Sequence, residues 1–425
     1  MADRRTTSAA DGGDDAGRRR DHVSRAVADA HRREWAYVLA ATARAAGDID
    51  LAEECVQDAY VAALDAWQRA GVPDNPGAWL TVTARRKALD ALRRQTSLRR
   101  KLPLLVEPED AGEGDDMPHI PDDRLRLVFT CCHPALAREA QVALTLRLVC
   151  GLSTAEIAQA FLVSEATMAA RVTRAKKKIA AARIAYRVPE SHELPDRLDA
   201  VLTVVHLVFT TGHAAPSGDA LVRADLVDRA LDLARMLHHL MPDEPEVRGL
   251  LALLMLTDAR RATRTAPDGR LLLLEEQDRS RWDAAAIAEG RRLTLAALHG
   301  GRPGRFALQA AIAAVHAEAP SYEATDWHEV RALYDVLLRL WPSPVVALNR
   351  AVAVAMTSGP EAGLAEMAAL DGPLAGYRYL PAARADLLCR LGRTAEAEAC
   401  YRQALELTDN APERAFLAAR IASLL

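Results

Sequence analysis

The residues from Ser164 to Ile179 have types and a spacing suited to contact with nucleic acid. Met168, Val172, Ala175 and Ile179 recur every three or four residues, which places them on one face of an α-helix. The other faces are small, polar or cationic, and such side chains let a helix enter the major groove and touch bases and phosphates. They include Ala169, Ala170, Arg171, Thr173, Arg174, Lys176 and Lys177. The pattern predicts a DNA-reading helix.

A second, shorter helix is predicted immediately before the DNA-reading helix. Ser153 and Glu156 have the spacing of a capping box, and Ser164 is placed to cap the following helix. A short helix, a turn and a capped basic helix form a helix-turn-helix, a common DNA-binding unit. The alternative is a basic helix that is merely solvated, and the turn and the caps favour the DNA-binding interpretation.

The distribution of charge points to the same partner. The formal net charge of the 425-residue chain is −4, but residues 123–187 carry eleven Lys and Arg against four Asp and Glu. Residues 103–122 have seven acids and four prolines, which is typical of a linker. Residues 85–101 are basic again, with eight Lys and Arg against one Asp. Two basic segments in an acidic chain indicate a nucleic-acid partner better than the overall charge does.

An amphipathic helix is predicted over residues 51–67, with Asp50 as its N-cap. Its apolar stripe consists of Leu51, Cys55, Ala59, Ala63 and Trp67. Its polar face carries Glu53, Glu54, Gln57 and Asp58. Asn75 then caps a further helix with Pro76 at its first position, and Trp79 anchors that helix ahead of the basic segment. On its own, an acidic helix beside a basic one is typical of a salt-bridged bundle.

Taken together, these motifs resemble bacterial RNA polymerase sigma factors of the extracytoplasmic-function (ECF) group. The resemblance rests on DLAEECVQDAY from residue 50, NPGAWLTVTARRKALDALRR from residue 75 and GLSTAEIAQAFLVSEATMAARVTRAKKKI from residue 151. It assigns residues 25–102 to sigma region two and residues 123–187 to region four. The last motif is the more specific, because it follows the region-four helix-turn-helix closely.

The resemblance implies a role for each motif. The clamp helices of the polymerase beta-prime subunit would be bound by Glu53, Glu54, Gln57 and Asp58. The minus-ten promoter element would be captured and contacted by Asn75, Trp79, Arg85, Arg86, Lys87 and Arg93. The minus-thirty-five element would be read by Ala169, Ala170, Arg171, Thr173, Arg174, Lys176 and Lys177. Core RNA polymerase, including its beta flap, and promoter DNA are the expected partners, and we expect no catalytic residue, metal or cofactor.

Residues 188–425 continue far beyond region four, where the minimal members of this group end. A 34-residue offset aligns Ala351 with Ala385, and residues 384–421 resemble a tetratricopeptide repeat. We expect a helical repeat-like domain that regulates the sigma modules in cis and holds a protein or peptide partner. Residues 271–283 concentrate acidic and basic side chains around one tryptophan, and both a salt-bridged structural loop and a ligand or partner site remain open for them.

The chain as a whole is predicted to be all-α, with two small sigma modules and a large C-terminal helical domain. Its composition is 50% apolar and only 4% aromatic, with much Ala and Leu. Residues 1–24 are polar and aperiodic and are predicted to form a disordered tail. The absence of a secretory signal or a membrane-spanning apolar run, and only six cysteines, lead us to expect a cytoplasmic protein.

Two other functions are consistent with the same motifs. A helix-turn-helix regulator with a helical-repeat sensor would bind its operator without core polymerase and would not need Asp58. An interaction scaffold would tolerate charge reversal in residues 171–178. An enzyme is not expected, because no nucleophile triad, P-loop or zinc-protease motif is recognised.

Overall fold

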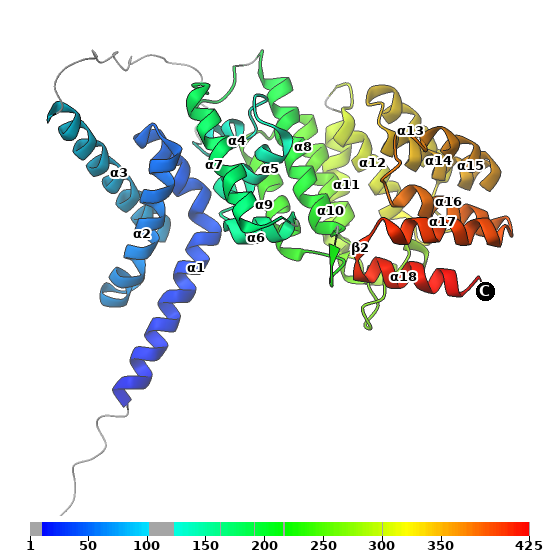
Figure 1. Cartoon of the computed structure of the whole chain (residues 1–425), viewed down its shortest axis with the longest axis horizontal. Helices are drawn as coiled ribbons and strands as arrows, with labels where there is room; N and C mark the ends of the chain where they lie inside the picture. The colour runs from blue at the N-terminus through cyan, green and yellow to red at the C-terminus, as the bar shows by residue number, and fades with distance from the viewer. Residues whose placement is uncertain are drawn as a thin grey trace, which may run out of the picture. The chain divides into compact units, whose positions relative to one another are not determined.

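The computed structural model describes residues 11–101, 123–161, 163–190, 192–215, 217–299 and 301–424. These residues form helices and one pair of two-residue strands, which confirms the predicted all-α class (Figure 1). The chain divides into two compact units, Met1–Val204 and Val205–Leu425. The predicted acidic linker, residues 103–122, lies outside the described residues. No helix within the described ranges is both long and apolar enough to span a membrane.

The first unit contains two groups of helices. The region-two group comprises α1 (Asp11–Ala46), α2 (Ile49–Ala70) and α3 (Pro76–Lys101). The region-four group comprises α4 (Asp123–Cys131), α5 (Arg138–Leu144), the π-helix η1 (Thr145–Val149), α6 (Thr154–Ala160) and α7 (Glu165–Ala181). In region two each helix packs against the other two, and fully buried side chains such as Trp67 and Leu80 fill the space between them (Figure 1).

The N-terminal end of region two differs from the prediction. α1 begins at Asp11, so residues 11–24 are helical and the prediction of a disordered tail is wrong from that residue onward. A helix that is already nucleated by packing extends at little cost. Residues 1–10 lie outside the described part of the chain.

The N-cap of α2 also differs from the prediction. Asp48 rather than Asp50 caps the helix, and its carboxylate accepts a hydrogen bond from the Leu51 amide at 2.9 Å. Both residues have a side chain suited to capping, and the turn at Gly47 brings Asp48 to the first orphan amides. Asp50 therefore lies in the first turn with its side chain exposed.

The predicted boundary at residue 188 does not coincide with the boundary between the units. α8 (Leu194–His213) starts in the first unit and ends in the second. Its first half is bonded to region four: Arg197 donates to the Phe129 carbonyl at 2.6 Å and Arg138 donates to the Ala200 carbonyl at 3.5 Å. Residues up to Val204 therefore belong structurally with region four.

The second unit is a series of antiparallel helix pairs. Its helices are α9 (Ala224–Leu240), α10 (Pro245–Asp258), α11 (Ala284–His299), α12 (Arg305–Glu318), α13 (Trp327–Leu340), α14 (Pro344–Ser358), α15 (Pro360–Met367), α16 (Tyr379–Arg390), α17 (Thr394–Glu406) and α18 (Ala411–Ala422). Short 3-10 helices are η2 (Arg261–Thr263), η3 (Leu274–Glu276), η4 (Arg279–Arg281) and η5 (Ala368–Leu370). The strands β1 (Ser217–Gly218) and β2 (Asp409–Asn410) pair in parallel and join the two ends of the unit.

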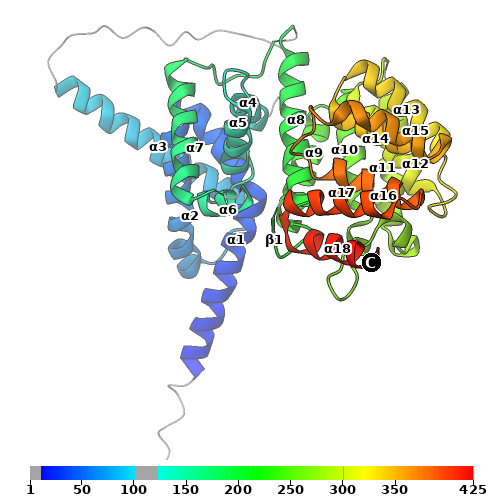
Figure 2. The same ribbon diagram turned by 45° about the vertical axis from the view of Figure 1, so that its right-hand side comes forward.

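The last helices form the hairpins expected from the 34-residue offset. Ala351 in α14 and Ala385 in α16 are both fully buried, each in the first helix of a hairpin. α16 packs against α17 and α17 packs against α18 around the side chains of Tyr401 and Leu417 (Figure 2). The array of helical hairpins is observed, while its relationship to tetratricopeptide repeats stays a prediction.

A close approach of α10 to α12 gives a direct test of this packing. A Cβ atom added at Gly249 would lie 2.5 Å from the backbone nitrogen of Ala307 and 2.8 Å from its Cα. Gly249→Ala should therefore lower the free energy of unfolding of the second unit by about 1–3 kcal/mol, as overpacking does. Scanning calorimetry measures the effect. Gly372→Ala, where a Cβ meets no atom within 4 Å, is the matched control and should change stability by less than about 0.5 kcal/mol.

Candidate nucleic-acid interface

The helix-turn-helix is built as the sequence predicts. The Glu156 carboxylate accepts from the Ser153 amide at 2.7 Å, and the Ser153 hydroxyl accepts from the Glu156 amide at 3.2 Å, which completes the capping box of α6. The Ser164 hydroxyl accepts from the Thr167 amide at 3.1 Å and caps α7. Two local signals thus fix both helix starts.

α7 divides into a buried face and an exposed face. Met168, Val172, Ala175 and Ile179 are buried, as the helical spacing predicts. The exposed residues among the minus-thirty-five candidates are Ala169, Ala170, Thr173, Arg174 and Lys177, whereas Arg171 is half-buried. Ala170 and Thr173 are exposed beside Arg174 on this face and are small, so the face can approach a nucleic-acid groove closely.

Lys176, the remaining candidate on α7, contacts region two. Its ammonium group lies 2.7 Å from the Asp50 carboxylate and 2.6 Å from the Glu53 carboxylate, and its side chain is only 13% exposed. Burial alone lowers the pKa of Lys176, but the charge of Glu53 and the hydrogen bonds to Asp50 and Glu53 outweigh it, so the pKa is raised. Lys176 is therefore charged and engaged with α2.

Of the polymerase-binding candidates on α2, three are exposed and one is not. Glu54, Gln57 and Asp58 point to solvent, while Glu53 is buried. The Glu53 carboxylate also lies 2.6 Å from the Arg147 guanidinium of η1, so two cations of region four hold it. We call Glu53, Arg147 and Lys176 the inter-region ion cluster.

The minus-ten candidates lie along α3 and at its N-cap. Asn75 caps the helix by accepting from the Ala78 amide at 2.9 Å, and Trp79 packs edge-on against Trp67 with the ring centres 5.7 Å apart. Arg85, Arg86 and Arg93 are exposed. Lys87 lies 3.4 Å from Asp58 of α2, which is the salt-bridged pairing expected of an acidic and a basic helix. Asn75 and Trp79 therefore also stabilise the helix that carries the cations.

A second contact joins region two to region four through α1. The Trp35 indole donates to the Leu148 carbonyl at 3.0 Å, and the Tyr186 hydroxyl donates to the Ala40 carbonyl at 3.1 Å. Gly151 lies against the Trp35 ring: its φ is +71°, and an added Cβ would lie 3.0 Å from ring atoms of both Trp35 and His31. Only glycine fits this close approach without strain.

Sequence reasoning missed several residues of these surfaces. Val61 on α2 is 64% exposed and lies one and two turns beyond Asp58 and Glu54 on the same side of the helix. The exposure of Val61 could have been predicted from the sequence, because Val61 falls outside the predicted apolar stripe of the helix. Arg147 and Trp35 carried no local signal, because their partners lie far away in the sequence.

Comparison with known proteins agrees with the two helix groups of the first unit. Residues 27–98 match sigma-70 region 2 and residues 126–179 match sigma-70 region 4. Residues 197–298 match a family of unknown function, DUF6596. The chain belongs to the sigma-70 family of RNA polymerase sigma factors, in the ECF group, and carries a further helical extension. These matches favour a sigma factor over the independent helix-turn-helix regulator.

Two individual relatives align with different lengths of this chain. An uncharacterized protein of Rhizobium meliloti (strain 1021) is 46% identical over 377 residues, which cover 87% of this chain and 89% of the relative. A probable ECF RNA polymerase sigma factor, SigI, of Mycobacterium tuberculosis is 30% identical over 178 residues, which cover 40% of this chain and 60% of that protein. The first alignment is too long to be confined to the sigma regions, so it includes part of the extension.

The inter-region ion cluster can be tested on the full chain. Lys176→Met should speed hydrogen exchange in residues 49–70 and 165–181 by about tenfold or more, because a charged hydrogen-bonded partner of Glu53 is lost. Exchange measured by mass spectrometry reports both segments at once.

The neighbouring lysine supplies the control. Lys177 is exposed, so Lys177→Met should leave exchange in both segments unchanged. Equal effects of the two variants would show that the ion cluster contributes nothing to holding α7 on α2.

Proposed function

We propose that this chain binds core RNA polymerase and directs it to promoters with minus-ten and minus-thirty-five elements. The observation that carries the proposal is the division of α7 into a buried apolar face and an exposed face of small and cationic residues. In this role the protein supplies specificity and performs no catalysis. It would act in the cytoplasm, where polymerase and DNA are found.

On DNA, Arg174 is the principal candidate for base contact. Its side chain is exposed on the groove-facing side of α7, opposite Met168 and Val172. Arginine can donate two hydrogen bonds to a guanine edge, and one good contact contributes about 1–3 kcal/mol.

Arg174→Ala should therefore lower promoter-specific run-off transcription with purified core polymerase about five- to a hundredfold. Arg183→Ala, which removes an arginine just beyond the C-terminus of α7, is the control and should retain most activity. An unchanged footprint over the minus-thirty-five element in the Arg174 variant would contradict the assignment.

On polymerase, the candidate docking surface is the exposed side of α2. Glu54 and Asp58 supply negative charge, and the exposed Val61 supplies an apolar contact beside them. A basic partner surface such as the clamp helices would be steered to this side of α2 electrostatically. Val61 would become buried on binding, and this apolar contact would slow dissociation.

Asp58→Arg should abolish co-purification with core polymerase without unfolding the protein. Asp58 is 62% exposed on its side chain and has one long ion pair, to Lys87, so reversal costs little stability. Asp21→Arg, at an exposed position on α1 outside this surface, should bind core polymerase normally. Wild-type recovery of core polymerase by the Asp58 variant would refute the docking surface.

The compact first unit supports a closed form of the free protein. The two promoter elements lie about 25 base pairs apart, or about 85 Å along B-DNA at about 3.4 Å per base pair. α2 has 22 residues and α3 has 26, so each is no longer than about 40 Å. While Lys176 is bonded to α2, the DNA-reading surfaces are too close to reach both elements. We infer that binding to polymerase and promoter separates α7 from α2.

The extension is proposed to act in cis on the sigma modules. Its presence in a relative of similar length, together with the sigma regions, supports a coupled role rather than passive attachment. The test compares transcription by residues 1–204 with that of the full chain at equal occupancy of core polymerase. This end point keeps the bonds of Arg197 and Arg138 within region four. Identical promoter output would leave the extension as an independently acting domain.

A further inference from the structure

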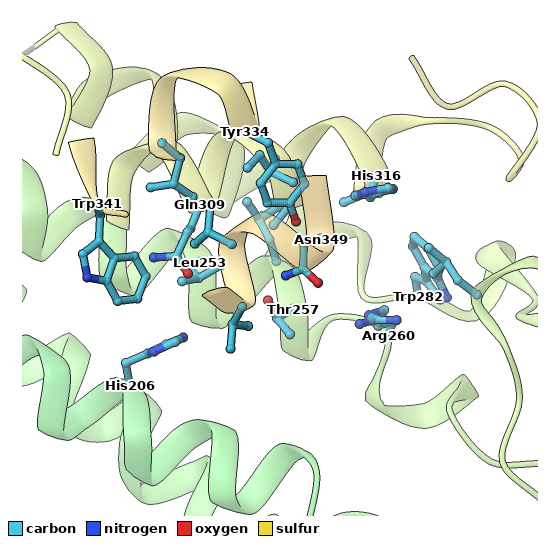
Figure 3. A pocket seen from close by; sticks show the side chains of 18 residues that line it. His206, Leu253, Thr257, Arg260, Trp282, Gln309, His316, Tyr334, Trp341 and Asn349 are labelled. Carbon is cyan, nitrogen blue, oxygen red and sulfur yellow. The ribbon is translucent and has the colours of Figure 1, made fainter. Parts of the chain in front are cut away.

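The second unit encloses a cavity that the sigma function does not use. Its volume is about 440 Å³, within the range of small-molecule sites. α8, α10, α12, α13 and α14 contribute side chains to it, and η3 and Trp282 close one side. Figure 3 shows Arg260, His316 and Trp282 at one end and His206 and Trp341 at the other. The walls between these ends are mostly apolar.

Arg260 brings an unmatched positive charge into this cavity. Within the described ranges no carboxylate lies within ion-pair distance of its guanidinium. Burial and the nearby charge of Arg279 both lower the pKa of Arg260. Arg260 is half-buried and lines the cavity. A partly desolvated cation without a counter-ion is costly, so a bound anion would be favoured here.

The acids near the cavity within the described ranges do not pair with Arg260. Asp258, two residues before Arg260, lies 2.7 Å from Arg261. Asp386 and Glu275 line the adjoining groove, and Asp386 lies 3.0 Å from Arg390. Burial lowers the pKa of Arg390, but the charges of Asp386 and Glu275 act on this arginine and raise its pKa. The charge of Arg260 is thus left for a group from outside the chain.

Neighbouring polar groups add hydrogen-bonding capacity without negative charge. Burial, followed by the charges of Arg260 and Arg279, lowers the pKa of His316 to about 4, so its ring is neutral at pH 7. Its Nδ1 atom is buried and has no hydrogen-bond partner in the described part of the chain. Such an orphaned polar atom beside an unmatched cation is a feature of ligand sites rather than of a finished core.

The wall that carries Trp282 is held in place without a ligand. Arg279 donates to the carbonyls of His316 at 2.6 Å and Ala319 at 2.7 Å and lies over the Trp282 ring. The Trp282 indole donates to the Thr263 hydroxyl at 2.9 Å. Residues 271–283 are therefore a bonded structural loop, and Leu274 and Trp282 of this segment also line the cavity. The interpretation of the segment as a ligand site stays a prediction. The site is preformed, which reduces the entropic cost of binding.

We propose that this cavity binds a small organic anion with a flat apolar body. The anionic group would pair with Arg260 beside His316, and the apolar body would lie among Trp282, Tyr334 and Trp341. A carboxylate and a phosphate ester share this chemistry. The proposal concerns binding alone and does not depend on the transcriptional role of the first unit.

The test is calorimetric titration of the full chain with probes that separate charge from shape. Indole-3-acetate and phenyl phosphate are the anionic probes, benzyl alcohol is the neutral one, and acetate and inorganic phosphate lack the apolar body. At least one of the two aromatic anions should bind about tenfold or more tightly than benzyl alcohol. It should exceed by the same factor the small anion with the same charged group, which is acetate for indole-3-acetate and inorganic phosphate for phenyl phosphate. The better of the two identifies the anionic group.

Two variants assign the binding to the cavity. Arg260→Gln should weaken the aromatic anion about tenfold or more, while Arg281→Gln, at an exposed arginine of the 271–283 loop, should not. Without ligand, Arg260→Gln should melt at or above the wild-type temperature, because an unmatched, partly desolvated charge is removed. If Arg260→Gln does not fold, hydrogen exchange of the wild type locates the ligand through protection of α12 and α13.

Three results would overturn the proposal. One is the failure of every aromatic anion to bind below about 1 mM. Another is equal affinity for the neutral and the anionic probes. The third is unchanged affinity in the Arg260 variant, or, where that variant does not fold, no protection of α12 and α13.

Discussion

A buried carboxylate held between two cations determines how the first unit is arranged. Glu53 of α2 lies 2.6 Å from Arg147 and 2.6 Å from Lys176, and both partners come from region four. Removing one partner of a buried pair usually costs about 3–5 kcal/mol, because the remaining charge stays uncompensated. The hydrogen bonds of Trp35 to Leu148 and of Tyr186 to Ala40 join the same two regions through α1. Region two and region four therefore form one compact unit, although the chain between them is an acidic, proline-rich segment.

This arrangement relates stability to function. The helix proposed to bind polymerase and the helix proposed to read DNA are each other's partners in the free protein. A ligand shifts such an equilibrium only by its differential affinity for the two states, so polymerase and promoter must together offset the loss of the ion cluster. Several kcal/mol are available from a protein interface and from counter-ion release on DNA. The closed form would thus keep the free protein from contacting both promoter elements at once.

Local patterns predicted much of this structure. Helical spacing identified the buried face of α7, and the capping residues Ser153 and Ser164 located both helices of the helix-turn-helix. Contacts between distant residues could not be predicted in this way. Nothing near Glu53 indicates that Arg147 and Lys176 lie against it, and nothing near Arg260 shows that its charge is unmatched. The N-cap of α2 depends on backbone geometry at Gly47, so two nearby aspartates could not be told apart from sequence.

The distance between α2 and α7 in solution tests the central claim most directly. Spin labels introduced through non-natural amino acids at Ala70 and Ala181, which are exposed at the ends of the two helices and lie outside the proposed polymerase and promoter contacts, report this distance by pulsed electron resonance. We predict one short, narrow distance distribution for the free chain. A longer distribution should replace it when core polymerase and promoter DNA are added. An unchanged distribution in the assembled complex, or a broad one in the free chain, would contradict a closed unit that opens to work.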